Sequence, residues 1–238
     1  MHFGLRAIYK KTLWALRLAF AVSVFFLPLA AQPPKDKRHA PSSGSNLTLR
    51  VYNYAGLSPS SLDLSEKVAT AIFQNVGIEP IWVDCPTSKL NAVAYQSCDS
   101  PMGPADFVVR ILPRRMADKV RHSQDSLGFA QICPASEPAC ELNLFYHRID
   151  ELAAKGYRAD RILGHAIAHE VAHILVGPAH AEDGIMRASW SPSDLNRISL
   201  GLQLDFSTNQ STQLRLALLR RSTLSAPSFL AQANLIAH

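Results

Sequence analysis

The sequence has 238 residues, of which 47% are hydrophobic and 18% are charged, a composition typical of globular rather than disordered proteins. Of its net charge of +5, the first 31 residues contribute +4, because they contain four basic and no acidic residues. The remaining residues contain 20 Lys and Arg against 19 acidic residues, a net charge of +1. This near balance gives no electrostatic basis for nucleic-acid binding.

The N-terminus, residues 1–31, has the pattern of a secretory signal peptide: a basic region, an apolar run over residues 18–29, and two alanines before a polar stretch. The apolar run is shorter than the roughly 20 residues that a membrane-spanning helix needs. We therefore expect cleavage and export to a secreted or periplasmic location, with an uncleaved membrane anchor as the alternative. Residues 32–46 are polar and rich in Pro and Ser, which predicts a disordered linker.

Strand and helix patterns follow one another from residue 47 onward, as expected for an α+β domain over residues 47–205. Apolar residues at helical spacing predict a helix that begins at Ser60 or Ser61 and ends at Gly77. Runs of β-forming residues predict strands at 47–54, 78–84, 107–112, 127–132 and 142–146. The basic residues between 114 and 121 indicate a solvated loop. Within residues 206–238 we expect a C-terminal helix over 213–221, and the rest has no clear pattern.

All four cysteines lie after the predicted signal peptide. An even number of cysteines in an exported chain predicts two disulfides. Of the three possible pairings we favour the local one, Cys85–Cys98 with Cys133–Cys140. The alternative is a second zinc site, but the cysteine spacings do not resemble the CxxC pairs that such sites use.

The chemistry of the chain centres on an HExxH motif formed by His169, Glu170 and His173. The apolar pattern around it predicts a long helix, with Asp160 as its N-cap. Histidines four residues apart project from one face of a helix, so both can bind a single zinc ion. Glu170 lies beside them, where a carboxylate can act as general base on a zinc-activated water.

A catalytic zinc ion usually has three protein ligands, so the motif needs a third. Gly177 and Pro178 form a helix-stop pair, after which the chain can turn back toward the metal. His180 is the natural third ligand, and Asp183 is a short-range alternative. Met186 follows in a tight turn, and Ser191 and Pro192 then predict the start of another helix.

These residues resemble the metzincin zinc peptidases, whose pattern is HExxHxxGxxH followed by a methionine turn. Here the glycine and the third histidine each come one residue later, giving HExxHxxxGxxH with Gly177 and His180. The resemblance implies a twisted, mostly parallel or mixed five-stranded sheet with a backing helix, an active-site helix, a Met-turn at Met186 and a C-terminal helix.

The resemblance also implies an activity, that of a zinc endopeptidase with one catalytic Zn²⁺ on His169, His173 and His180 and with Glu170 as general base. Its partner would be a protein or peptide substrate lying extended along an edge strand, for which residues 142–146 are the candidate. We expect no nucleic-acid partner, and membrane attachment only if the N-terminal segment stays uncleaved.

Two other functions use the same residues. The first is a catalytically inactive, peptidase-like protein that binds zinc and a partner. The second is a three-histidine zinc endoribonuclease, which the neutral charge, the export signal and Glu170 disfavour. Two further side chains have simpler interpretations. His165, one helical turn before His169, is expected either to support the ligands or to pack in the core. Trp190 is expected to be an aromatic side chain that packs in the core.

Overall fold

The structure, a computed structural model, describes residues 47–88, 96–120 and 125–225. The predicted signal peptide, the linker and the tail after residue 225 lie outside the described residues. Among those described, no helix is both long and apolar enough to cross a membrane. The described residues belong to one compact unit.

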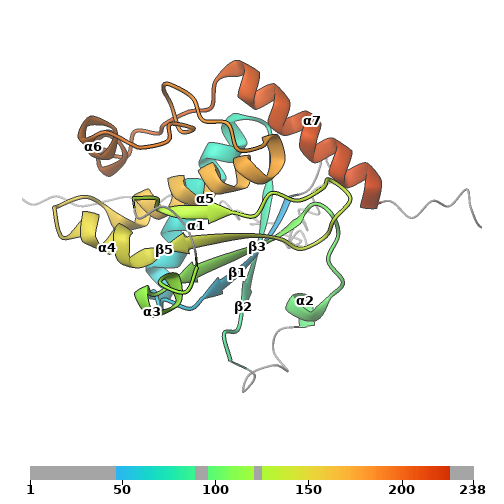
Figure 1. Cartoon of the computed structure of the whole chain (residues 1–238), viewed down its shortest axis with the longest axis horizontal. Coiled ribbons are helices and arrows are strands. Elements are labelled where there is room, and N and C mark those ends of the chain that lie inside the picture. The colour runs from blue at the N-terminus through green and yellow to red at the C-terminus, as the bar shows by residue number, and fades with distance from the viewer. Residues whose placement is uncertain (1–46, 89–95, 121–124, 226–238) are drawn as a thin grey trace, which may run out of the picture. The chain divides into compact units, whose positions relative to one another are not determined.

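A five-stranded mixed sheet forms the centre of this unit (Figure 1). Its spatial order is β2-β1-β3-β5-β4. The first four strands in this order run parallel, and β4 pairs antiparallel with β5. The strands are β1 (Leu47–Asn53), β2 (Pro80–Cys85), β3 (Asp106–Leu112), β4 (Gly128–Ala130) and β5 (Cys140–Phe145). The mixed α+β architecture expected from the sequence is therefore confirmed.

The edge-strand expectation is wrong. Residues 142–146 were the candidate edge strand, but β5 lies inside the sheet between β3 and β4. The reason is the antiparallel return after β4, which inserts β5 beside β3 and leaves β4 at the edge. Tyr146 does not belong to the strand, because it begins a helix.

Seven helices surround the sheet within the described residues. They are α1 (Pro59–Asn75), α2 (Gln96–Asp99), α3 (Arg114–Ala117), α4 (Tyr146–Ala153), α5 (Ala159–Val176), α6 (Pro192–Leu200) and α7 (Thr208–Ser225). The sequence did not predict α2, α3 or α4. The last helix, α7, is longer than the predicted 213–221.

The sequence predicted the starts of α5 and α6, and the structure confirms only the second. The start of α6 is confirmed: Ser191 is its N-cap and forms a capping box with Asp194. The cap predicted for α5 is wrong, because Asp160 lies in the first helical turn and Arg158 occupies the N-cap position. The carboxylate of Asp160 accepts hydrogen bonds from the backbone N–H of Arg161 and from the Arg158 side chain instead.

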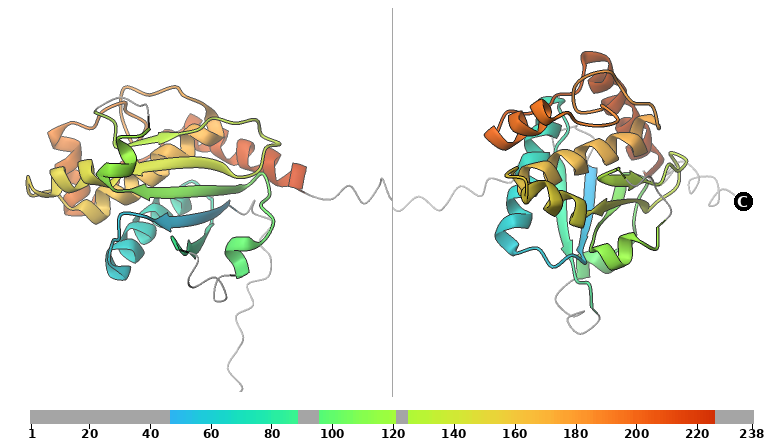
Figure 2. Two further views of the ribbon diagram at one scale, coloured as in Figure 1. Left: turned by 60° about the horizontal axis from the view of Figure 1, so that its bottom comes forward. Right: turned by 60° about the vertical axis from the view of Figure 1, so that its left-hand side comes forward.

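One face of the sheet is apolar and meets α1 and α5, which pack against each other (Figure 2). Its residues alternate along the strands, and the register brings Val51 beside Val109 and Val109 beside Leu142. These three side chains are buried. The opposite face is more polar and carries an ion pair of 2.7 Å between Arg110 and Glu141. The core therefore lies between the sheet and the two helices.

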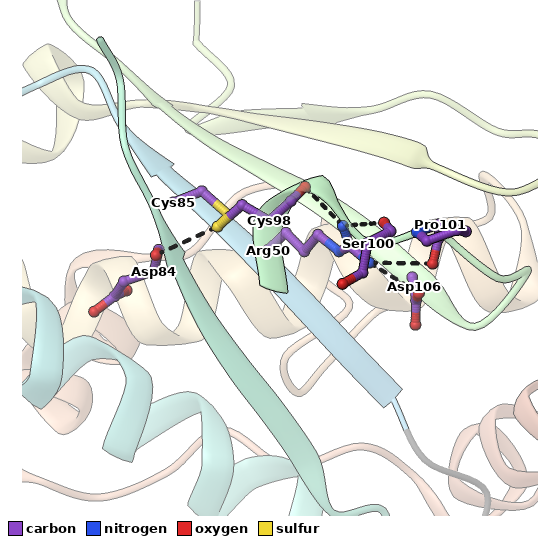
Figure 3. Close-up of a disulfide and its surroundings, with 7 residues drawn as sticks. All are labelled: Arg50, Asp84, Cys85, Cys98, Ser100, Pro101 and Asp106. Atoms are coloured by element: carbon purple, nitrogen blue, oxygen red, sulfur yellow. Dashed lines mark hydrogen bonds and ion pairs between the residues drawn. A yellow bond between two sulfur atoms is a disulfide. The ribbon is translucent and has the colours of Figure 1, made fainter. Parts of the chain in front are cut away.

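A disulfide between Cys85 and Cys98 attaches α2 to the end of β2 (Figure 3). The buried side chain of Arg50, on β1, donates hydrogen bonds to the carbonyl oxygens of Cys98 and Ser100 at 2.9 and 2.8 Å. The segment from α2 to Ser100 is thus held both by the disulfide and by hydrogen bonds from β1.

The second disulfide, Cys133–Cys140, closes the connection between β4 and β5. Arg221 of α7 donates hydrogen bonds to the carbonyl oxygens of Cys133 and Pro104 at 3.1 and 3.0 Å, and its guanidinium lies over the Phe107 ring. These contacts join the C-terminal helix to the loop beside β4. Both disulfides have the local pairing favoured from the sequence.

Candidate metal centre

The HExxH motif lies on α5, in the stretch from Ile162 to Leu175 that is buried at every position. This stretch is buried because α1, α4, α6, α7 and the sheet pack around the helix. A side chain on such a helix has little freedom to move. The motif is therefore held on a rigid element, as a metal site requires.

The imidazole rings of His169 and His173 face each other across one turn of α5. Their Nε2 atoms lie 3.0 Å apart, and the two residues are only 9% and 8% exposed. The spacing of four residues thus produces the convergence that the sequence predicts.

The other ring nitrogen of each histidine contacts a backbone carbonyl. His169 Nδ1 lies 2.8 Å from the oxygen of Ile185, and His173 Nδ1 lies 2.9 Å from the oxygen of Gly177. A carbonyl can only accept, so each Nδ1 carries the proton and each Nε2 presents its lone pair. Two lone pairs facing each other at this distance repel unless a cation lies between them.

The pKa values of these rings indicate the neutral form. Burial lowers the pKa of His169 to about 4 and lowers that of His173, so both rings are neutral at pH 7. Hydrogen bonds to Ile185 and Gly177 oppose the effect without cancelling it. Neutral imidazole is the form that binds metal ions.

His180 comes from the loop after α5 and completes a group of three. Its ring centroid lies 5.5 Å from that of His169 and 4.8 Å from that of His173. One nitrogen of each ring lies within 4.8 Å of the others, a grouping suited to a single metal ion. His180 is exposed, so its side of the group faces solvent. Within the described part of the chain this group does not include Asp183.

The turn that follows His180 is fixed by the core. Ala181 N–H donates to the Met186 carbonyl oxygen at 2.8 Å, and Ile185 N–H donates to that of Asp205 at 3.1 Å. Gly184 has a positive φ of 69°, and a Cβ at this position would lie 2.5 Å from the Asp205 oxygen. Only glycine therefore fits. Met186 is 1% exposed and packs in the core.

Glu170 lies against the edge strand β4. A Cβ at Gly128 would come within 2.8 Å of the Glu170 Oε1 and Cγ atoms, so the strand approaches the carboxyl group closely. Burial raises the pKa of Glu170 to about 8, and a hydrogen bond from the backbone of Ala130 opposes this rise. Gly128 was not identified from the sequence, although a glycine within a predicted strand is a signal of close approach.

His165 has a structural role. Its Nδ1 donates to the Arg161 carbonyl oxygen at 2.8 Å, and its Nε2 accepts a hydrogen bond from Leu204 N–H at 3.2 Å. Both nitrogens are therefore used, and burial lowers the pKa of the ring to about 4. Of the two roles expected from the sequence, packing in the core is the one observed.

Trp190 does more than pack. Its indole N–H donates to the carbonyl oxygen of Ile185 at 3.1 Å, the same oxygen that accepts from His169. No feature of the sequence signals this contact, because it depends on the path of the turn.

Comparisons with known proteins find similarity in structure only. No protein-family model matches the chain, and no curated protein matches it in sequence. Archaemetzincin from Methanopyrus kandleri is 18% identical with a TM-score of 0.43, over 76% of this chain and 99% of that one. Metalloproteinase-II from Bacteroides fragilis is 12% identical with a TM-score of 0.45, over 74% and 54%. Myroilysin is 15% identical with a TM-score of 0.30, over 70% and 71%. The chemical case for the site therefore rests on its own geometry.

Proposed function

We propose that this chain is an exported zinc-dependent endopeptidase, in which His169, His173 and His180 hold one zinc ion and Glu170 is the general base. The observation that carries the proposal is the 3.0 Å approach of the His169 and His173 Nε2 atoms, each with its Nδ1 bonded to a carbonyl. That arrangement is unfavourable without a cation and favourable with one.

The donor set fits zinc. Three neutral imidazoles with a fourth position left open are typical of catalytic zinc, whereas structural zinc sites usually have four protein ligands. The exposure of His180 supports an open side that water and substrate can reach. Zinc at such a site supplies a Lewis acid that polarises a carbonyl group and acidifies water.

Glu170 is suited to moving the proton in peptide hydrolysis. A carboxyl group with a pKa near the working pH can accept a proton from the attacking water and return it to the leaving amine. Gly128 and the backbone of Ala130 hold the carboxyl group in place from β4.

The proposed substrate is a protein or peptide that lies extended along β4. Within the described residues this strand has a strand partner, β5, on one side only. An added strand could pair along its other edge, on which the Ala130 N–H already donates to Glu170. β4 also adjoins Glu170. We therefore assign the substrate edge to β4 in place of residues 142–146.

Two further proposals concern the chain as a whole. The two disulfides support an oxidising compartment, secreted or periplasmic, with membrane attachment only if residues 1–31 stay uncleaved. We propose residues 47–205 as the peptidase domain and residues 206–238 as a C-terminal extension, of which α7 packs on α5.

The test compares wild-type protein with Glu170→Ala. Both should contain about one zinc ion by mass spectrometry, because Glu170 is not a ligand, and only the wild type should cleave casein or a degenerate peptide library. The matched control is Glu66→Ala, which removes a partly buried carboxyl group on α1 and should preserve both zinc and cleavage. Equal cleavage by wild type and Glu170→Ala would reject the mechanism.

The same samples distinguish the other functions. Zinc binding without cleavage of any peptide would favour a peptidase-like binding protein. Cleavage of labelled RNA, but not of peptide, would favour an endoribonuclease.

A further inference from the structure

We propose that Trp190 is a positioning residue for the metal site, because it holds the carbonyl oxygen that orients His169. This inference rests on the metal binding in the proposed function. It goes beyond the ligands by naming a side chain that touches no metal and yet sets how tightly metal is bound.

The central atom is the carbonyl oxygen of Ile185. It accepts hydrogen bonds from His169 Nδ1 at 2.8 Å and from Trp190 Nε1 at 3.1 Å. A carbonyl oxygen has two lone pairs, so these two donors use its full capacity. Indole N–H is a donor only, and the direction of the Trp190 bond is therefore fixed.

The backbone of Ile185 is held on both sides of its Cα atom. Its N–H donates to the Asp205 carbonyl oxygen at 3.1 Å, and its carbonyl is held by the Trp190 side chain. The Ile185 side chain is fully buried. A carbonyl fixed in this way is a defined acceptor, and it sets the direction in which His169 Nε2 points.

The indole ring also limits rotation of the imidazole. Trp190 meets His169 edge to face, with ring centroids 6.1 Å apart and planes at 89°. It meets His165 in the same manner at 6.0 Å and 83°. His165 is itself bonded to Leu204. The indole thus lies between a metal ligand and a structural histidine of the same helix.

Loss of the indole N–H should leave the Ile185 carbonyl with one anchor fewer, and His169 should then adopt a wider range of orientations. Changes in groups that orient metal ligands typically weaken binding by about 10- to 100-fold. Trp190 does not contact the ligand nitrogen and acts only through the Ile185 carbonyl. We therefore expect a loss at the lower end of this range, about 10-fold in zinc affinity.

The matched control is Trp82. Its indole N–H donates to Thr70 Oγ1 at 2.8 Å, it is also half-buried, and it joins β2 to α1 away from the histidines. Trp190→Phe and Trp82→Phe therefore remove the same chemical group from similar environments. A purely structural role for Trp190 would make the two variants alike.

The experiment measures the dissociation constant for zinc by competition with a chelator, in wild type and both variants, after circular dichroism has verified folding. We expect Trp190→Phe to bind about 10-fold more weakly and Trp82→Phe to bind as wild type does. Peptide cleavage by Trp190→Phe should recover as zinc is raised to saturation. Equal zinc affinity in the two variants would overturn the inference.

A second variant covers the case in which Trp190→Phe does not fold. Benzothienylalanine introduced at position 190 has nearly the shape of tryptophan and lacks the N–H, and the same loss in affinity is expected. Wild-type protein that binds no zinc would reject the proposed function and this inference together. Wild-type protein that binds zinc, with unchanged affinity in the isosteric variant, would reject the inference alone.

Discussion

His173 and His169 lie one turn apart on α5, yet different parts of the chain orient their rings. His173 bonds to the carbonyl of Gly177, four residues later, and Gly177 N–H donates back to the His173 carbonyl at 3.0 Å. The carbonyl that orients the His173 ring thus lies at the end of its own helix. His169 bonds to Ile185, sixteen residues later, in a turn that Trp190 and Asp205 hold in place.

Because the two rings have different supports, a given substitution should disturb one ligand and not the other. Any sequence that ends α5 at Gly177 also orients His173. Correct orientation of His169 needs the path of the turn as well, and this turn carries His180. Changes in the turn should therefore affect two of the three ligands and spare the third.

The largest effect is expected from removing a helix ligand. His169→Ala leaves two imidazoles, too few for a catalytic zinc ion, so bound zinc should fall from about one per chain to nearly none and cleavage should be lost. His147→Ala on α4 is the control and should keep both. Mass spectrometry of the metal content measures this, and a full zinc ion in His169→Ala would rule the site out.

The second largest effect is expected from removing His180, the ligand in the turn after α5. His180→Ala is expected to weaken zinc binding by more than the roughly 100-fold seen for supporting groups, because it removes a ligand itself. Asp183→Ala should have no effect, since Asp183 is not part of the histidine group. Chelator competition on both variants decides the point. If Asp183→Ala loses zinc and His180→Ala keeps it, the third ligand is the aspartate.

A change in β4 should separate catalysis from metal binding. In Gly128→Ala the new Cβ would displace the Glu170 carboxyl group, and a misplacement of about 1 Å can lower a rate by roughly 100-fold. Neither histidine support involves β4, so zinc affinity should not change. Steady-state kinetics and chelator competition are measured together. Unchanged kcat would show that the position of Glu170 does not matter.

The smallest effect concerns stability. His165→Phe keeps a ring but removes the acceptor of the buried Leu204 N–H, at a cost of about 1–3 kcal/mol in the free energy of unfolding. Urea unfolding of the metal-free protein measures it. A variant as stable as wild type would show that His165 does not fix this part of the fold.

The same variant tests a pH dependence. The pKa of His165 is about 4 in the folded protein and near 6.5 when unfolded, so the unfolded state binds the proton more readily. Its contribution to stability is therefore complete above pH 6.5 and is lost as pH falls toward 4. His165→Phe should show a smaller loss over this window than wild type. An identical slope in the two proteins would contradict the assignment.

Local patterns predicted a large part of this structure. The four-residue spacing placed His169 and His173 on one helix face, and the Ser191–Pro192 pair located the start of α6. Such features depend on neighbours in sequence, which is why reading along the chain finds them. The local pairing of the cysteines succeeded for the same reason.

The failures depend on contacts between distant segments. Strand order was not visible in the patterns, so residues 142–146 were taken for an edge when β4 occupies it. The contact of Glu170 with Gly128 spans two elements. The double use of the Ile185 carbonyl by His169 and Trp190 needs the folded turn. Contacts such as these, between residues far apart in the sequence, can be identified only from the tertiary structure.

The most direct test of the central claim is X-ray absorption at the zinc edge of the loaded wild-type protein. Convergence of His169, His173 and His180 predicts three imidazole nitrogens at about 2.0–2.1 Å and one further light atom. His180→Ala, measured at a zinc concentration high enough to load the weakened site, should show one imidazole fewer. A wild-type spectrum with two imidazoles or fewer would contradict the three-histidine site.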